Sequence, residues 1–282
     1  MSYNLYKKVS FDISGIVTKT YSTSFSLAIK VFDRETKEAI TSVYGFVRLA
    51  DEIADSFHGF DKKELMNEIR NDVLKAQKNN ISLNPIIHSF HLTAEMYKIP
   101  SAFINDFLDS MEMDLTNDHY EGSEYDKYVY GSAEVVGLMC LKIFCNNDEK
   151  LFEKLSDSAR ALGSAFQKVN FLRDIKSDMR ERGRIYLRNA GDKDMVNDYN
   201  KAILEQEIEE EFKTALSGIK QLPYNAKLGV YSAYLYYLLL FRKIRKMKID
   251  KLMSKRVRIS NFTKLGVLIT SVIRHKLTRV FE

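Results

Sequence analysis

Proline and glycine most restrict the fold of this chain, because both are scarce. The 282 residues contain 3 prolines and 12 glycines, whereas average usage is about 5% proline and 7% glycine. A β-sandwich or barrel needs many tight turns and therefore more of both. The sequence also has no glycine-rich phosphate loop of GxGxxG or GxxxxGK spacing. The chain is therefore predicted to be mostly helical.

Apolar residues recur at intervals of three and four through most of the chain, as they do in amphipathic helices. One such series is Val43, Phe46, Val47, Ala50 and Ala54. We predict an all-α fold of about eight to ten helices, with the three prolines at helix boundaries. No linker or repeat divides the sequence, so residues 1–282 are predicted to form a single domain.

The sequence also predicts which side chains of two further segments are exposed. Ile203–Ile219 has the pattern of an acidic amphipathic helix with a solvated outer face. His88 and His91 are three residues apart, but no acidic third ligand lies nearby in the sequence. Both histidines are predicted to lie on the surface.

Positive charge is concentrated toward the C-terminus. Between Arg242 and Arg279 there are thirteen Lys and Arg residues and a single acid, Asp250. Such a region suits an anionic partner: nucleic acid, a membrane surface or a phosphorylated substrate.

Several features favour a cytoplasmic protein. Cys140 and Cys145 lie in an apolar run without CxxC spacing, as expected for core residues in a reducing compartment. The first residues lack the apolar stretch of a signal peptide. The longest apolar run, Leu228–Phe241, has 14 residues and is too short to span a bilayer. Peripheral contact with the inner face of a membrane is left open.

Arg48, Asp51 and Asp55 form the first group of candidate site residues. The two aspartates are four residues apart and project from one helix face, with Arg48 one turn earlier. They share this face with the apolar stripe that should enter the core, where an unpaired carboxylate is costly. Two such carboxylates can hold Mg²⁺ and leave positions for phosphate oxygens and water. A solvated acidic patch is the alternative interpretation.

A second polar stripe follows on another predicted helix. It consists of Gln167, Asn170, Asp174 and Asp178, with Arg173 and Lys176 beside it. Two carboxylate-bearing helices across a cavity can hold a cluster of Mg²⁺ ions, which with Arg and Lys can bind and ionise a diphosphate. The resulting carbocation needs a water-free pocket, and the 17 Phe, 16 Tyr and 10 Met residues can line one.

At these motifs the sequence resembles the squalene/phytoene synthase family. The aspartate-rich segments that carry the resemblance are Asp51–Asp55 and Asn170–Asp178. Other similar segments, in the same order as in the family, are Tyr21–Phe25, Tyr44–Arg48, Met111–Leu115, Tyr130–Gly131, Val136–Met139 and Arg184–Leu187. The resemblance implies an isoprenoid synthase fold, a helical bundle around a central cavity. It also implies head-to-head joining of two prenyl diphosphates through a cyclopropyl diphosphate, with loss of two diphosphates.

The resemblance assigns roles to individual positions. The implied metal ligands are Asp51, Asp55, Asn170, Asp174 and Asp178. The implied diphosphate-binding residues are Arg48, Arg173 and Arg258, with Ser22, Tyr44 and Gln167 close by. Tyr130 and Tyr234 match pocket positions near the reacting carbons and join Arg48 and Arg173 in the implied catalytic set. Ser22 is equally compatible with a helix cap, and Tyr234 with a core aromatic.

The resemblance also implies which small molecules and partners to expect. The cofactor is Mg²⁺, with Mn²⁺ as an alternative ion, and no nicotinamide is expected for phytoene synthesis. The substrate is a prenyl diphosphate, and no nucleic acid partner is expected. Contacts with downstream carotenoid enzymes are left open.

Glu134 and Glu112 depart from the family pattern, which usually has glycine and arginine at these positions. An ionised carboxylate inside an apolar tunnel is very unfavourable, so Glu134 is predicted to face away from it or to pair with a cation. The favoured reaction makes phytoene from two geranylgeranyl diphosphates. One alternative is a squalene or dehydrosqualene synthase that uses two farnesyl diphosphates.

Two further alternatives are less compatible with the motifs. A chain-elongating prenyltransferase or terpene cyclase would not place Arg173 directly before Asp174. A non-catalytic relative that acts in protein assembly should have lost metal ligands, whereas all five are present here.

Overall fold

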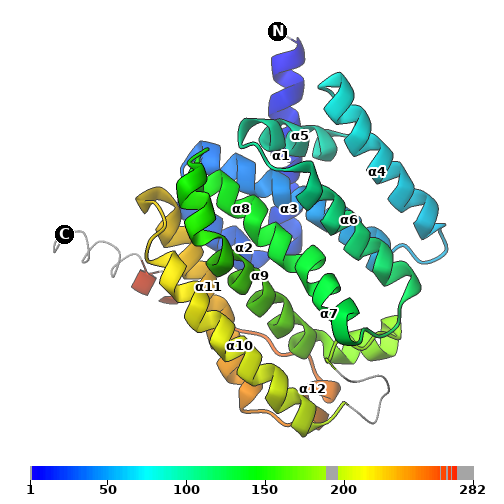
Figure 1. Cartoon of the computed structure of the whole chain (residues 1–282), viewed down its shortest axis with the longest axis vertical. Helices are drawn as coiled ribbons and strands as arrows, with labels where there is room; N and C mark the ends of the chain where they lie inside the picture. Colours follow the sequence, from blue (N-terminus) through cyan, green and yellow to red (C-terminus); the bar gives the residue numbers. More distant parts are fainter. Residues whose placement is uncertain (1, 189–195, 261, 265, 268, 272–282) are drawn as a thin grey trace, which may run out of the picture.

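The computed structural model describes residues 2–188, 196–260, 262–264, 266–267 and 269–271, and this part of the chain is built from helices (Figure 1). In chain order they are α1 Ser2–Tyr21, α2 Thr23–Ala28, η1 Ile29–Val31, α3 Arg34–Asp55, α4 Lys62–Asn79, α5 Pro85–Met96, α6 Ser101–Thr116, α7 Gly122–Val129, η2 Tyr130–Glu134, α8 Val135–Cys145, α9 Glu149–Ser177, η3 Asp178–Arg182, α10 Asp198–Ile219, α11 Tyr224–Arg245 and α12 Ile249–Ser254. The segment η1 is a 3₁₀ helix, whereas η2 and η3 are π-helical. In the described ranges, extended pairing is confined to one isolated bridge, between His119 and Ile185. The all-α prediction is confirmed.

The described residues form twelve α-helices, more than the eight to ten predicted. Two of these, α2 and α12, have six residues each and are too short to show a 3.6-residue period in the sequence. The prolines lie where they were predicted: Pro85 opens α5, and Pro100 and Pro223 directly precede α6 and α11. The missing N–H of proline costs least at a helix start, where backbone N–H groups have no helical partner.

Two clusters of buried apolar side chains hold the bundle together. The first joins α3, α5, α6 and α8, and in it the rings of Phe46 and Phe90 stack 4.0 Å apart. The second joins α9, α10 and α11 and includes Ile208, Phe212 and Phe241. Each such side chain contributes about 1.5–3 kcal/mol when it is fully buried. Helices α8 and α9 pack against each other and connect the two clusters (Figure 1).

The prediction that His88 and His91 lie on the surface is wrong. Both are buried on α5, and the ring of Tyr6 on α1 stacks on His88 with 5.0 Å between centroids. Burial lowers the pKa of both imidazoles. The apolar composition of α5 explains the burial, because most of its surface is covered by α1, α3 and α4.

Helix α10 is amphipathic, as predicted, but it begins earlier, at Asp198. Ile208 and Phe212 belong to the buried cluster shared with α9, and Glu210 and Lys213 are exposed. The predicted solvated face is therefore confirmed, and the opposite face of the helix is buried.

Within the described residues, one helix is long and apolar enough to cross a membrane. It runs without interruption over Gly122–Cys145, through α7, η2 and α8, and 67% of its apolar window is buried inside the protein. This is the pattern of a core helix. Cys140 and Cys145 are free thiols on α8, half-buried and buried respectively, in agreement with their predicted place in the core.

Candidate active site

Helix α3 carries the first pair of aspartates. It begins after Asp33, whose carboxylate caps the first turn, and ends at Asp55. Its apolar face enters the first core cluster, which holds the last turns in the wall of a cavity. Arg48 donates a hydrogen bond to Asp51 at 2.6 Å and pairs with Glu52.

Helix α9 carries the second stripe and continues into the π-helical turn η3. Asp174 accepts a hydrogen bond from Arg173 at 2.5 Å and forms an ion pair with Arg256 at 2.7 Å. Asp178 opens η3 and accepts a hydrogen bond from Arg182 at 2.5 Å. The turn thus brings a basic side chain back to the acidic stripe, and π-helical turns are frequent at functional sites.

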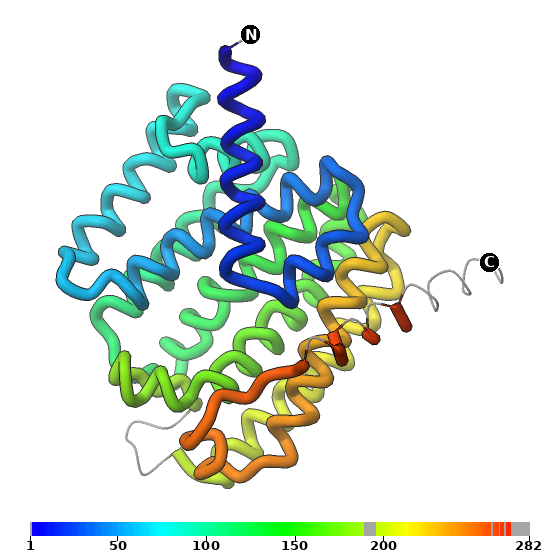
Figure 2. The backbone as a smooth tube through the Cα atoms, turned by 180° about the vertical axis from the view of Figure 1, so that it is seen from behind, coloured from blue at the N-terminus to red at the C-terminus, as the bar shows by residue number. Residues whose placement is uncertain are grey.

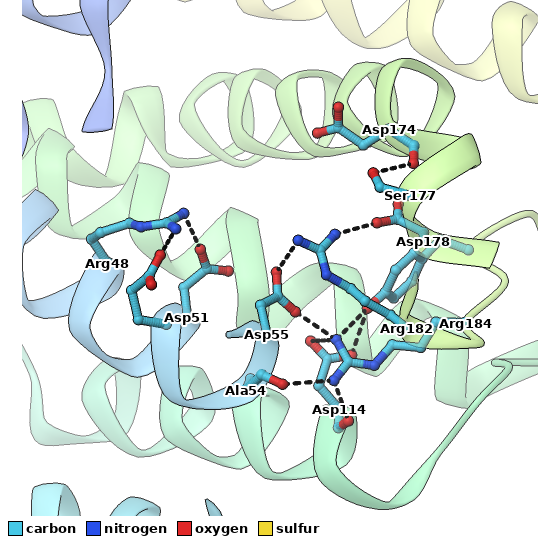
Figure 3. A network of polar contacts seen from close by, with 12 residues as sticks. Arg48, Asp51, Ala54, Asp55, Asp114, Asp174, Ser177, Asp178, Arg182 and Arg184 are labelled. Carbon is cyan, nitrogen blue, oxygen red and sulfur yellow. Dashed lines mark hydrogen bonds and ion pairs between the residues drawn. The ribbon is translucent and has the colours of Figure 1, made fainter. Parts of the chain in front are cut away.

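Arg182 and Arg184 join the two acidic segments (Figure 3). The guanidinium of Arg182 lies 3.1 Å from Asp55 and 2.5 Å from Asp178. Arg184 lies 2.7 Å from Asp55 and donates a hydrogen bond to the carbonyl of Ala54 at 3.0 Å. The aspartates therefore have counter-charges from outside the two stripes as well. A sequence signal for Arg184 exists, since it opens a family-like segment, but none singles out Arg182.

A buried carboxylate on α6, Asp114, supports Arg184. The backbone carbonyl of Asp114 accepts a hydrogen bond from Arg184 at 2.7 Å, and its side chain lies 3.7 Å from the guanidinium. Tyr120, Tyr128 and Tyr186 each donate a hydrogen bond to the same carboxylate, at 2.8, 2.9 and 2.8 Å. A buried carboxylate needs this many partners to offset the cost of losing water. The network fixes Arg184 and, through it, the acidic end of α3.

The acidic segments line one end of a cavity of about 990 Å³, at the upper end of the 300–1,000 Å³ range of ligand pockets. The remaining walls are largely apolar or small side chains of α2, α3, α8, α9, α10 and α11. On α9 the lining runs from Asp174 back to Leu155, a distance of about 28 Å at 1.5 Å per residue. The cavity therefore combines a charged end with a long apolar body.

Most of the residues predicted for the site line this cavity. They are Ser22, Tyr44, Arg48, Asp51, Asp55, Gln167, Asn170, Arg173, Asp174, Asp178 and Arg258. The hydroxyl of Ser22 also accepts a hydrogen bond from the Phe25 N–H at 3.2 Å and so caps α2. Ser22 therefore both caps a helix and lines the cavity. Tyr44 stacks on Phe25, and burial raises the pKa of Tyr44 to about 12.

The segment that contains both acidic stripes also matches a known family. A family model described as squalene/phytoene synthase matches residues 18–190. The chain belongs to the squalene/phytoene synthase family. The family resemblance predicted from the two aspartate-rich motifs is confirmed.

Curated relatives of this synthase-family chain include enzymes named for different products. The 4,4'-diapophytoene synthase of Staphylococcus haemolyticus is 28% identical over 198 residues, which cover 67% of this chain and 65% of that protein. The phytoene synthase of Mycobacterium bovis is 29% identical over 182 residues, 63% of this chain and 57% of that protein. The chain thus matches less than two thirds of the length of these relatives.

Solved structures support the fold. A dehydrosqualene synthase crystallised with a ligand superposes with a TM-score of 0.81 at 20% sequence identity, covering 98% of this chain and 99% of that one. At this identity the likeness concerns the fold, and the predicted isoprenoid synthase bundle is confirmed.

Tyr130, for which the resemblance implies a pocket position, is not among the residues that line the cavity. Tyr130 and Glu134 lie at the two ends of η2, and neither lines the cavity. The Arg160 guanidinium lies 5.4 Å from the Tyr130 ring centroid and 2.7 Å from the Glu134 carboxylate. The cavity side of this π-helical segment is taken by Ser132 and Ala133. The prediction that Glu134 pairs with a cation is confirmed.

Tyr234 is not a pocket residue either. Its ring meets that of Phe212 edge-on at 5.4 Å between α11 and α10, which is the packing that the core-aromatic interpretation predicts. The cavity side of α11 instead presents Ala233 and Tyr237. Tyr237 donates a hydrogen bond to Asn170 Oδ1 at 3.3 Å. The helical period predicts that Tyr234 and Tyr237 differ in direction on the helix. It does not predict which of the two faces the cavity.

The charged end of the cavity suits a hard divalent cation. Its aspartates offer oxygen ligands, which Mg²⁺ prefers. Burial and then the charge of Asp55 raise the pKa of Asp51 to about 6, and burial raises the pKa of Asp178 to about 7. The arginines therefore compensate these carboxylates incompletely.

No ready-made metal cage is present in the described part of the chain, where no three His, Cys, Asp or Glu side chains gather around one point. An ion held by one or two carboxylates takes its other ligands from phosphate and water, which is the usual way proteins bind Mg²⁺. The residues at the charged end fit this mode.

Proposed function

We propose that this chain, as a single domain of residues 1–282, joins two prenyl diphosphates head to head and makes phytoene from two geranylgeranyl diphosphates. The observation that carries the proposal is one cavity whose charged end gathers aspartates and arginines from α3, α9 and η3, while its body is apolar. This arrangement matches a substrate with a dianionic head and a hydrocarbon tail. The reaction runs through a cyclopropyl diphosphate and releases two diphosphates.

The charged end binds and ionises the diphosphate. Arg48, Arg173 and Arg258 line the cavity there and supply positive charge to the leaving oxygens. Asp51, Asp55, Asn170, Asp174 and Asp178 are the residues that would hold Mg²⁺. When bound, the metal supplies Lewis-acid neutralisation of the leaving group.

The apolar body protects the reacting carbons from water. Phe25 and Phe166 are among its lining residues, and Tyr44 and Tyr237 stack on them at 5.1 and 3.8 Å. Such walls exclude water that would otherwise capture a carbocation. Because the pKa of Tyr44 is raised to about 12, its hydroxyl stays neutral at physiological pH.

Incubation with labelled prenyl diphosphates tests the proposal. Geranylgeranyl diphosphate alone is expected to yield a C40 hydrocarbon and diphosphate, with no requirement for reduced nicotinamide. Better turnover of farnesyl diphosphate would favour the squalene-type alternative, which the similarity to a 4,4'-diapophytoene synthase supports. No diphosphate release from either substrate would leave the non-catalytic alternative.

Ala159→Phe is expected to shift the substrate preference toward the shorter tail. Ala159 lines the cavity on α9, fifteen residues before Asp174 and so about 22 Å from the charged end. A geranylgeranyl tail has five more carbons than a farnesyl tail, and each buried methylene contributes about 0.8 kcal/mol. The ratio of kcat/KM for geranylgeranyl over farnesyl diphosphate should therefore fall by at least about 100-fold.

Ala161→Phe is the matched control for this change, because Ala161 lies on the same helix but does not line the cavity. Its substrate ratio should stay close to that of the wild type. An unchanged ratio in Ala159→Phe would show that the tail does not reach this part of the cavity.

Glu134→Gly is expected to leave the substrate preference within about twofold. The Glu134 carboxylate points to Arg160 and away from the cavity, and a half-exposed ion pair of this kind contributes about 0–1 kcal/mol. Competition between the two labelled substrates measures the preference. Improved use of the longer substrate by Glu134→Gly would contradict the placement of this side chain.

A further inference from the structure

Asp55 is one of the residues that would hold Mg²⁺ in the proposed function, yet both oxygens of its carboxylate already face an arginine. Arg184 donates a hydrogen bond to Oδ1 at 2.7 Å, and the guanidinium of Arg182 lies 3.1 Å from Oδ2. A cation that binds Asp55 therefore has to compete with one of these two arginines for an oxygen.

Arg184 is the arginine that stays in place. Its side chain is 8% exposed. It also donates hydrogen bonds to the backbone carbonyls of Ala54 and Asp114 at 3.0 and 2.7 Å, and to the hydroxyl of Tyr186 at 3.2 Å. Displacement of Arg184 would leave these buried acceptors without a donor, which is unfavourable.

Arg182 has fewer contacts. Its partners in the described part of the chain are the carboxylates of Asp55 and Asp178. Its side chain is 27% exposed and lines the cavity. Arg182 can therefore turn away from the carboxylates without unpairing a backbone group, and a ligand in the cavity can reach its guanidinium.

The fold holds this guanidinium between the two acidic segments. Asp178 opens η3 and Arg182 closes it, so the two side chains are four residues apart and can pair. Gly183 ends the turn with a φ of 71°, a left-handed conformation that favours glycine, and its N–H bonds to the Asp178 carbonyl. Figure 2 shows the end of α3 and η3 on the same side of the molecule, where Arg182 reaches across to Asp55.

We propose that Arg182 is a built-in counter-ion that competes with a divalent cation for Asp55 and Asp178, so that the substrate-free chain holds the metal weakly. The guanidinium and the cation require the same carboxylate oxygens, and their like charges repel. The proposal rests on the metal ligands of the proposed function. It does not depend on the prenyl substrate or the product, and it is tested without either.

The competition links metal binding to the arrival of a diphosphate. Phosphate oxygens accept hydrogen bonds from a guanidinium in the same bidentate way as carboxylates do. A diphosphate that enters the cavity can therefore take over Arg182 and free Asp55 and Asp178 for the cation. The metal is then bound tightly once the diphosphate is present.

Equilibrium dialysis of the substrate-free chain against Mn²⁺ at pH 7.5 tests the competition. Arg182→Gln is expected to lower the Kd for Mn²⁺ by at least about tenfold, because a charge-assisted hydrogen bond no longer has to be broken first. Arg182→Lys should give a smaller gain, since an ammonium group keeps the charge but lacks the planar fork that bridges two carboxylates. The matched control, Arg180→Gln, removes an exposed arginine of the same turn that does not line the cavity and should stay within twofold of the wild type.

A second background identifies the carboxylate that gains the cation. In Asp55→Asn, the further change Arg182→Gln should lower the Kd by less than about threefold. Circular dichroism in chelator establishes that the variants are folded, and Mn²⁺ should raise the melting temperature of Arg182→Gln by more than that of the wild type. An Mn²⁺ affinity of Arg182→Gln equal to or below that of the wild type would overturn the proposal, as would a full gain in the absence of Asp55.

Inorganic diphosphate tests the link to the substrate head group. It should tighten Mn²⁺ binding to the wild type by a larger factor than to Arg182→Gln, because the variant has no guanidinium to release. The complex of Mn²⁺ and diphosphate in solution is the same for both proteins and does not affect this comparison. Equal factors would overturn the link. Failure of prenyl diphosphates to react would refute the proposed function and leave these binding results unchanged.

Discussion

Asp51→Asn and Asp174→Asn are each expected to lower kcat/KM by at least about 100-fold, the scale seen when one charge-stabilising group is removed from an active site. Both aspartates line the charged end of the cavity, one on α3 and one on α9. In the proposed reaction each is needed to place the cation that neutralises the diphosphate. Initial rates of diphosphate release over a range of substrate concentrations that extends below KM, at fixed Mg²⁺, measure the loss.

The same two substitutions should have opposite effects on the stability of the metal-free protein. The pKa of Asp51 is raised to about 6, mainly by burial and then by Asp55. A carboxyl whose pKa is higher in the folded state opposes folding once it ionises, from its unfolded pKa of about 4 upward. Asp51→Asn should therefore leave the melting temperature unchanged or raise it at pH 7.5.

The pKa of Asp174 is shifted in the opposite direction to that of Asp51. Burial acts to raise its pKa, but the hydrogen bonds and charges of Arg173 and Arg256 outweigh burial, and the pKa of Asp174 is lowered. Its charge stabilises the fold above the unfolded pKa of about 4, and this contribution is lost as the pH falls through the folded value. Asp174→Asn should cost about 1–3 kcal/mol of unfolding free energy at pH 7.5.

Asp72→Asn is the matched control for both effects. Asp72 is a half-exposed aspartate of α4, 4.0 Å from Lys75 and outside the cavity, so its replacement should change activity and stability little. Thermal unfolding of the four proteins in chelator gives the comparison. A fall in stability of equal size for Asp51→Asn and Asp174→Asn would show that the two carboxylates are held in equivalent surroundings.

Removal of divalent cations is expected to abolish turnover and leave the helical fold intact. Activity depends on a cation because the raised pKa values of Asp51 and Asp178 indicate incompletely compensated charge at the substrate end. The fold should survive, because Arg182 already bridges Asp55 and Asp178 without metal. Chelator should therefore bring diphosphate release to background while circular dichroism is unchanged, and added Mg²⁺ or Mn²⁺ should restore activity. Full activity in excess chelator would refute the metal assignment.

The helical class and both acidic stripes could be predicted from the sequence, because they depend on local spacing. Scarce glycine and proline exclude turn-rich folds, and aspartates four residues apart share a helix face in any helix. The family resemblance extended this prediction to further site residues, most of which line the cavity. Tyr130 and Tyr234 do not line the cavity, because the register of η2 and the rotation of α11 against α10 decide which side chains reach it.

Tertiary structure alone decided the partners of these side chains. Arg182 neutralises Asp55 from 127 positions along the chain, and nothing in the local sequence of either residue indicates that contact. Helix α1 shows the same limit: its period reveals two faces, and its packing on α3 and α5, where a Cβ on Gly45 would come within 2.9 Å of Ser14 Oγ, buries the face that carries Ser10, Ser14 and Thr18. Helical periodicity follows from the repeat of a single helix, whereas counter-ions and buried faces depend on which distant helices it meets.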